Sequence, residues 1–207
     1  MFQTMRTSGL IAFLLIASFA IAQTEFSAEI VDTQKSDNSS KAKIYMAKDK
    51  IRIESTANNA RGGGAMIMNL ATQTSTVLMD QQHMYMEMPA QMGNQRIVYN
   101  FFRTGDVENA CSDWAQQAKN KGGTCHKVGS DTINGRSTVK YEGTNASGES
   151  STFWIDPKLR FPVKWQGKNS GGELHNIQEG AQPTSLFEIP AGYTKFDTGG
   201  MMQQRPQ

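Results

Sequence analysis

The sequence predicts a mostly β protein of the α+β class, built on a curved antiparallel sheet. Many short segments alternate apolar and polar residues, which is the pattern of strands with one buried face. Short turn sequences such as Asn134-Gly135 separate several of these segments and are typical of two-residue hairpins. One segment instead carries an apolar stripe with helical spacing. We expect about ten strands and one good helix.

The clearest alternation lies in the stretch from residue 65 to residue 89, and we expect the rest of the chain to be organised around it. The alternation falls into three runs: Ala65–Leu70, Thr74–Met79 and His83–Met88. The third run places three methionines on one face, Met84, Met86 and Met88, opposite His83, Tyr85 and Glu87. Met66 and Met68 repeat the pattern in the first run. These runs predict an antiparallel meander with a methionine-rich apolar face.

Further strands are predicted on both sides of this meander. Lys48-Asp49 is short enough for a tight hairpin between two of them. The segment 95–103 is compatible with either helix or strand, and 186–193 is a final apolar segment broken by Pro190 and Gly192. The expected strands are Phe26–Asp32, Lys41–Ala47, Lys50–Ser55, Lys127–Ile133, Ser137–Tyr141, Ser150–Ile155, Arg160–Gln166 and Gly171–Gln178.

The predicted helix follows the N-cap Asp106 and carries an apolar stripe from Val107 to Ala118 that includes Trp114. Lys119 and Lys121 form its cationic last turn, and Gly122 ends it. Cys111 lies on the same stripe, and Cys125 follows shortly after the helix. In an oxidising compartment such a pair favours a disulfide over a redox or metal role, because the spacing is far wider than C-x-x-C. Closing this loop would stabilise the fold by about 3 kcal/mol on the chain-entropy model.

The start of the chain predicts export. Arg6 precedes an apolar run of about ten residues that ends in Ala20-Ile21-Ala22, the pattern of a cleaved secretory signal peptide. The run is too short for a transmembrane helix, which needs about twenty apolar residues, and no cysteine follows for lipid attachment. We therefore expect a signal peptide at 1–22, a single β-rich domain at 23–197, a disordered tail at 198–207, and a periplasmic or secreted protein with no integral membrane segment.

Removing residues 1–22 takes away one of the 21 basic residues, so 20 basic residues face 19 acidic ones in the mature chain. This balance argues against nucleic acid as a partner, since nucleic acid requires a field of one sign. The three histidines, His83, His126 and His175, are far apart in the sequence and have no metalloprotease spacing, and no G-x-S-x-G motif is present. The sequence therefore predicts no catalytic residue, no cofactor and no enzyme.

Four segments carry a resemblance to a known family: KIYMAKDKIRIES, MIMNLATQTSTVLMDQQHMYMEMP, FWIDPKLRFPVK and SLFEIPAGYTKFD. The chain from about Phe26 to Asp197 resembles the exported bacterial domain-of-unknown-function 4412 family, which is similar to the lipoprotein-carrier (LolA/LolB-like) superfamily. The resemblance implies a half-open barrel of antiparallel strands, with one or two helices on its concave face and an apolar concavity that holds acyl chains in the carriers.

Three functions are compatible with these observations. The first is a non-enzymatic carrier for an apolar ligand, a lipid or a lipidated protein, because methionine adapts to varied apolar partners. The residues expected to line its ligand site are Met66, Met68, Met84 and Met86. The second is a Cu(I)-binding periplasmic protein that uses the methionine-rich strand, since thioethers are soft ligands. The third is a structural envelope protein, in which the methionines only pack the core.

Overall fold

The computed structural model describes residues 24–34, 40–55, 63–89, 107–115 and 120–196. Their strands form one sheet of twelve, in the order β12-β6-β5-β4-β3-β2-β1-β11-β10-β9-β8-β7. All neighbours for which the register is given are antiparallel except β12 and β6, which are parallel. The strand bounds are β1 Phe26–Val31, β2 Ser40–Ala47, β3 Lys50–Ser55, β4 Gly64–Asn69, β5 Thr74–Met79, β6 Met84–Pro89, β7 Thr124–Ile133, β8 Arg136–Thr144, β9 Ser150–Asp156, β10 Phe161–Gly167, β11 Gly171–Glu179 and β12 Thr194–Lys195.

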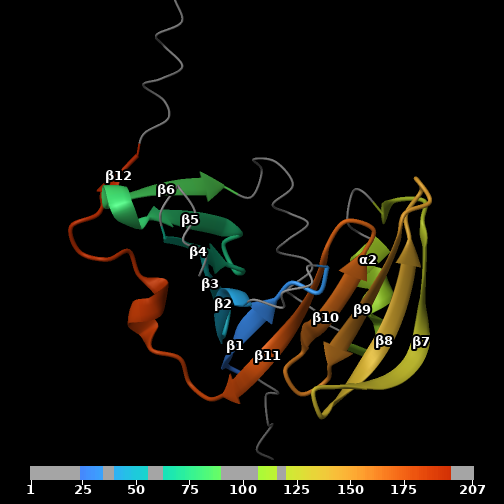
Figure 1. The fold of residues 1–207 in the computed structure, drawn as a ribbon. Coiled ribbons are helices and arrows are strands. Elements are labelled where there is room, and N and C mark those ends of the chain that lie inside the picture. Colours follow the sequence, from blue (N-terminus) through green and yellow to red (C-terminus); the bar gives the residue numbers. More distant parts are fainter. Residues whose placement is uncertain (1–23, 35–39, 56–62, 90–106, 116–119, 197–207) are drawn as a thin grey trace, which may run out of the picture.

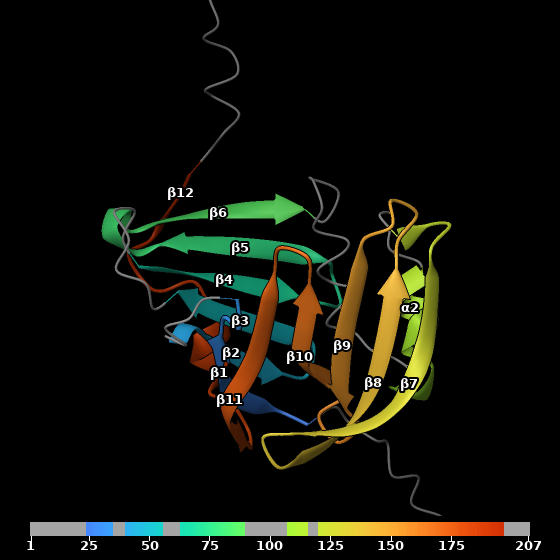
Figure 2. The same cartoon turned by 45° about the vertical axis from the view of Figure 1, so that its right-hand side comes forward.

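The sheet is bent into two walls. One wall is formed by β2 to β6 and the other by β7 to β10, and the neighbouring strands β1 and β11 join them (Figures 1 and 2). Among the described strands, β12 and β7 stand at opposite ends of the strand order, so the sheet does not close into a barrel. The predicted fold class, a curved and unclosed antiparallel sheet, is confirmed.

The predicted two-residue hairpins follow from local backbone chemistry. Asn134 and Gly135 both have positive φ, 48° and 77°, as a type I′ turn requires. They connect β7 to β8 with Ile133 opposite Arg136. Lys48 has a φ of 47° in the turn between β2 and β3. These turns fix the register and therefore decide which side chains share a face.

Cross-strand partners point to the same side of a sheet, and this rule defines the inner face. Phe26 of β1 pairs with Met46 of β2, which pairs with Ile51 of β3. All three side chains are at most 1% exposed. The Phe26 ring meets Phe161 edge-on, with 5.3 Å between ring centroids, and so ties β1 to the beginning of β10. The main core therefore lies where the two walls join.

The predicted helix is present as two shorter pieces. A 3-10 turn at Val107–Asn109 (η2) leads into the helix α2 at Ala110–Ala115. Trp114 and Ala110 are its buried residues, as the apolar stripe predicts. The predicted end of the helix extends into residues 116–119, outside the described part. The expectations for 1–22, for 95–103 and for 198–207 also lie outside it.

Two segments differ from the expected pattern. The strand predicted at His83–Met88 begins one residue later, because His83 adopts a left-handed φ of 48° and ends a 3-10 turn at Asp80–Gln82 (η1). The final apolar segment contains a 3-10 helix at Thr184–Phe187 (η4) and then the two-residue strand β12. Its apolar residues Leu186, Phe187 and Tyr193 pack on the outer face of the sheet.

Candidate functional site

The described part of the chain contains seven methionines, and all of them lie on the inner face of the sheet. The register links them strand by strand. Met68 is paired with Ile51 on one side and Ser75 on the other, and Val77 lies between Met66 and Met86. Met79 is directly opposite Met84. The seven residues are Met46, Met66, Met68, Met79, Met84, Met86 and Met88.

Exposure of these methionines rises from the middle of the sheet toward β6, the last strand before the two-residue β12. Met46 and Met68 are buried, at 0% and 1% exposure. Met68 belongs to the main core cluster, and Met66 packs against that cluster while remaining partly exposed. Met84 and Met86 are half-buried on β6. Of the four residues predicted to line a ligand site, Met68 therefore lies in the core and the other three reach solvent.

Met79 and Met88 share this face with the predicted residues and are also half-buried. The alternation within β6 places Met88 on the same face as Met86. The pairing of Met79 with Met84 depends instead on the connection between β5 and β6. This connection consists of η1 and His83, and it brings Met79 directly opposite Met84. We define the methionine surface as the five half-buried members: Met66, Met79, Met84, Met86 and Met88.

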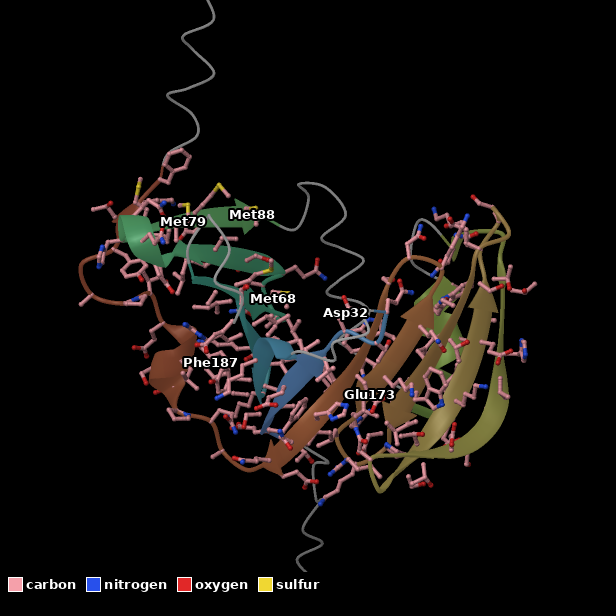
Figure 3. The ribbon with its side chains drawn as sticks, in the orientation of Figure 1. Asp32, Met68, Met79, Met88, Glu173 and Phe187 are labelled. Atoms are coloured by element: carbon pink, nitrogen blue, oxygen red, sulfur yellow. A yellow bond between two sulfur atoms is a disulfide. The ribbon has the colours of Figure 1, made fainter. Side chains whose placement is uncertain are left out.

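The outer face of the same strands is covered by the chain itself. Phe187 of η4 packs with Ile67 and Leu78, which alternate with the inner methionines. Figure 3 shows Met68 directed toward the space between the walls and Phe187 on the opposite side of the sheet. The hydroxyl of Tyr193 donates a hydrogen bond to Asp80 at 2.8 Å, and this bond raises the pKa of Tyr193 above its ordinary value of 10.0. The chain thus buries Ile67 and Leu78 on the outer face, although a hollow of about 280 Å³ remains there beside Ile67, Thr76 and Phe187.

The other wall contains a cleft of about 290 Å³ at the end where β9 begins and β10 ends. Trp114, Phe153 and Trp165 supply its aromatic lining. Phe153 and Trp165 are cross-strand partners on the inner face, in register with Gly172. The cleft was not predicted from the sequence. The feature of the sequence that marks the cleft is a row of small residues across three strands. A search for alternating apolar residues does not detect such a row.

That row consists of Gly143, Ser151 and Gly167, which are cross-strand partners on β8, β9 and β10. The Trp114 ring lies directly on Gly143, where an added Cβ would be 2.5 Å from the Trp114 Cε2 atom. The Trp165 ring lies in the same way on Gly172, where an added Cβ would be 2.2 Å from Cζ2. Glycine is therefore required at both positions for the two indoles to lie flat against the sheet.

The position of Trp114 is fixed from both ends of its helix. The predicted disulfide is present, linking Cys111 of α2 to Cys125 of β7 with 5.4 Å between Cα atoms. Beyond the helix, the buried Asn120 side chain donates a hydrogen bond from Nδ2 to the Trp114 carbonyl oxygen at 2.9 Å. The disulfide thus holds the helix on the inner face, beside the cleft.

Trp154 and Asp156 of the Trp154-Ile155-Asp156 motif lie on the outer face of this wall, whereas Ile155 packs on the inner face with Phe153 and Trp114. The Trp154 indole N–H donates to Asp131 at 2.9 Å, and two lysine ammonium groups lie 5.5 and 5.4 Å from its ring centre. The buried Asp156 accepts hydrogen bonds from the backbone N–H groups of Lys158 and Leu159 and is paired with Arg136. These contacts indicate a structural role for the motif.

The described histidines do not converge on a site. His83 packs edge-on against Tyr193, with 5.7 Å between ring centroids, while His126 and His175 lie beside Glu142 and Glu173. Within the residues that the structure describes, no three His, Cys, Asp or Glu side chains are grouped so as to hold a metal ion. In the same part of the chain, no helix has the length and apolar character needed to cross a membrane.

No protein-family model matches the sequence, and no curated protein matches it. The fold does resemble solved structures. An uncharacterized conserved protein from Thermus thermophilus matches with a TM-score of 0.54 and 8% identity, over 85% of this chain and 91% of that one. This likeness shows a common fold.

Two further solved structures match with lower TM-scores. A LolA superfamily protein from Nitrosomonas europaea has a TM-score of 0.32 and 10% identity, over 82% of this chain and 91% of its own. The Mycobacterium tuberculosis lipoprotein LppX has a TM-score of 0.38 and 15% identity, over 77% and 85%. Membership of the domain-of-unknown-function 4412 family stays a prediction.

Proposed function

We propose that this chain is a non-enzymatic, exported carrier that binds an apolar ligand, a lipid chain or a lipidated protein, on its methionine surface. One observation carries the proposal: every described methionine lies on the inner face, and five of the seven keep part of their side chain in contact with solvent. Methionine side chains are flexible and polarizable, so they adapt to acyl chains of varied shape.

Core packing alone accounts for Met46 and Met68, which are at most 1% exposed. It accounts less well for the methionine surface, whose five side chains stay partly exposed, whereas Ile67 and Leu78 on the outer face are buried against Phe187. An apolar surface that the chain leaves partly open on one side of a wall is the surface that an apolar ligand would cover. Export brings the protein to the compartment where lipid chains need a carrier.

The test is titration of the mature, disulfide-bonded protein with a fluorescent C18 fatty acid such as cis-parinaric acid. We expect saturable binding, and native mass spectrometry of protein purified without detergent should show a co-purifying acyl ligand. An absence of saturable binding, together with a ligand-free mass, would refute the carrier function.

Matched variants on β6 separate the inner face from the outer face. The double variant Met84→Gln/Met86→Gln introduces polar side chains of similar length, and we expect affinity to fall at least about tenfold. Glu87→Gln is the control, since Glu87 points to the outer face and pairs there with Lys195. Equal affinity losses in both variants would contradict the assignment of the site to the inner face.

The alternative of a Cu(I) site is favoured by one specific observation. Met79 and Met84 are cross-strand partners, and Met86 follows on the same face, so three thioethers lie on neighbouring positions. The double variant Met84→Leu/Met86→Leu distinguishes the two functions. Fatty-acid binding should largely persist because leucine preserves apolar volume, whereas stoichiometric Cu(I) binding, if wild type shows it, should be lost.

A further inference from the structure

We propose that the cleft between Trp114 and Trp165 is a second binding site, and that it takes a neutral, hydroxyl-rich ring, a saccharide. The cleft lies on the opposite wall from the methionine surface and shares no residue with it. The inference therefore does not rest on the carrier function. It rests on the shape, the aromatic lining and the charge balance of the cleft.

The shape limits the ligand to about one ring. A volume of about 290 Å³ lies at the lower end of the range of small-molecule sites, about 300–1,000 Å³. The floor is low because Ser151 and Gly167 place no large side chain on the inner face between the two tryptophans. An acyl chain requires a longer apolar channel, whereas a single pyranose ring fits a short, open cleft.

The aromatic lining places apolar surface next to polar groups: Trp165 is partly exposed, and Trp114 and Phe153, each 6% exposed, add a smaller share. The axial C–H groups of a sugar ring pack against the face of an indole, and its hydroxyl groups remain free to form hydrogen bonds at the ring edge. Trp114 and Trp165 are both held flat by the glycines beneath them. A binding surface that is already rigid loses little conformational entropy when a ligand binds.

The charge balance of the described lining disfavours ions as the preferred ligand. Fourteen of the described residues line the cleft, and two of these are charged, Glu149 and Lys168, with opposite signs. Glu149 already accepts a hydrogen bond from the Asn145 amide at 3.2 Å. Most of the other polar lining residues are serine, threonine, asparagine or glutamine. Neutral donors and acceptors of this kind match the hydroxyl groups of a sugar. A phosphate ligand would require a surplus of positive charge in the lining. A quaternary ammonium ligand would require an aromatic cage with a surplus of negative charge.

The experiment is a titration of the mature protein with methyl glycosides of glucose, galactose and N-acetylglucosamine. Binding is measured by tryptophan fluorescence and by ¹H–¹⁵N NMR of the indole N–H signals. We expect at least one sugar to bind saturably, with a dissociation constant near ~1 mM. The Trp114 and Trp165 signals should shift, while Trp154, on the outer face, stays unchanged and serves as an internal control.

Two variants test the location. Ser151→Leu fills the floor of the cleft and should abolish the titration. Asn169→Ala removes an exposed amide from the rim and should weaken binding by about threefold to tenfold without affecting folding. Val128→Ala is the control, because Val128 is 46% exposed on β7 and does not line the cleft.

Either of two results would overturn the proposal. The first is that no glycoside shifts the Trp114 or Trp165 signals up to about 50 mM, well above the expected constant. The second is that inorganic phosphate or tetramethylammonium binds the cleft more tightly than every sugar. Fatty-acid binding by Ser151→Leu reports on the methionine surface alone, so failure of the saccharide site and failure of the carrier function remain distinguishable.

Discussion

Gly143 is the position at which a single added methyl group should displace the Trp114 side chain. In Gly143→Ala the new Cβ would lie 2.5 Å from Cε2, 2.6 Å from Cζ2 and 2.9 Å from Nε1 of Trp114. The indole is held by the disulfide-linked helix and cannot swing away freely. Inserting a methyl group into such packing costs about 1–3 kcal/mol. The lower entropy of the unfolded alanine chain returns only about 0.4–1 kcal/mol.

We therefore expect Gly143→Ala to lower the free energy of unfolding by about 1–2 kcal/mol in urea titrations. The near-ultraviolet circular dichroism of tryptophan should change as well. Gly167→Ala is the matched control, since Gly167 lies in the same row of the sheet and its added Cβ would be 3.5 Å from the nearest atom, Ser170 Oγ. This contact is ordinary, and we expect unchanged or slightly higher stability. Equal stability of the two variants would refute the packing of Trp114 on Gly143.

Three further predictions follow from named contacts. Reduction of Cys111–Cys125, which are separated by 14 residues, should cost about 3 kcal/mol of unfolding free energy, measured in urea with and without dithiothreitol. Burial alone would raise the pKa of Glu173, but hydrogen bonds from Lys164 and Asn134 bring it below its ordinary value of 4.5. The stability that these bonds supply is therefore complete above this pH and is lost as the pH falls below it, and Glu173→Gln should flatten that part of the pH–stability curve. Phe187→Ala should lower the unfolding free energy by about 3 kcal/mol, because the ring is 7% exposed between apolar neighbours on the outer face; a loss below about 1 kcal/mol would contradict this packing.

Strand positions could be predicted because alternation and turn chemistry are local properties. Predicted strands such as Lys50–Ser55 agree with the structure, and Asn134-Gly135 forms the hairpin that its φ preference indicates. β12 could not be predicted, since two residues carry no period. Its place beside β6 depends on backbone hydrogen bonds from Thr194 and Phe196 to the carbonyls of His83 and Tyr85.

The candidate site was predictable in part for the same reason. Alternation placed Met84 and Met86 on one face, but it could not separate Met68, in the core, from Met66, at its margin. That difference arises from what packs above each residue, which involves strands far away in the sequence. The cleft is harder still, because its floor is made by Ser151 and Gly167, which are cross-strand partners beside the Gly143 that carries the Trp114 ring. A hydrophobicity pattern contains no signal for a row of small residues.

The two apolar faces of β2 to β6 explain why the proposed carrier function depends on the C-terminal segment. In β4 both faces carry apolar residues, with Met66 and Met68 on one face and Ile67 on the other. The sequence pattern alone therefore did not indicate which face a ligand could reach. Phe187 and Tyr193 decide this by covering the Ile67 face, with Arg52 donating a hydrogen bond to the Leu186 carbonyl at 2.9 Å. Ile67 and Leu78 are therefore shielded from water by the chain itself, whereas the methionine surface stays partly exposed. This difference between the two faces is the physical basis for proposing that the ligand binds the inner one.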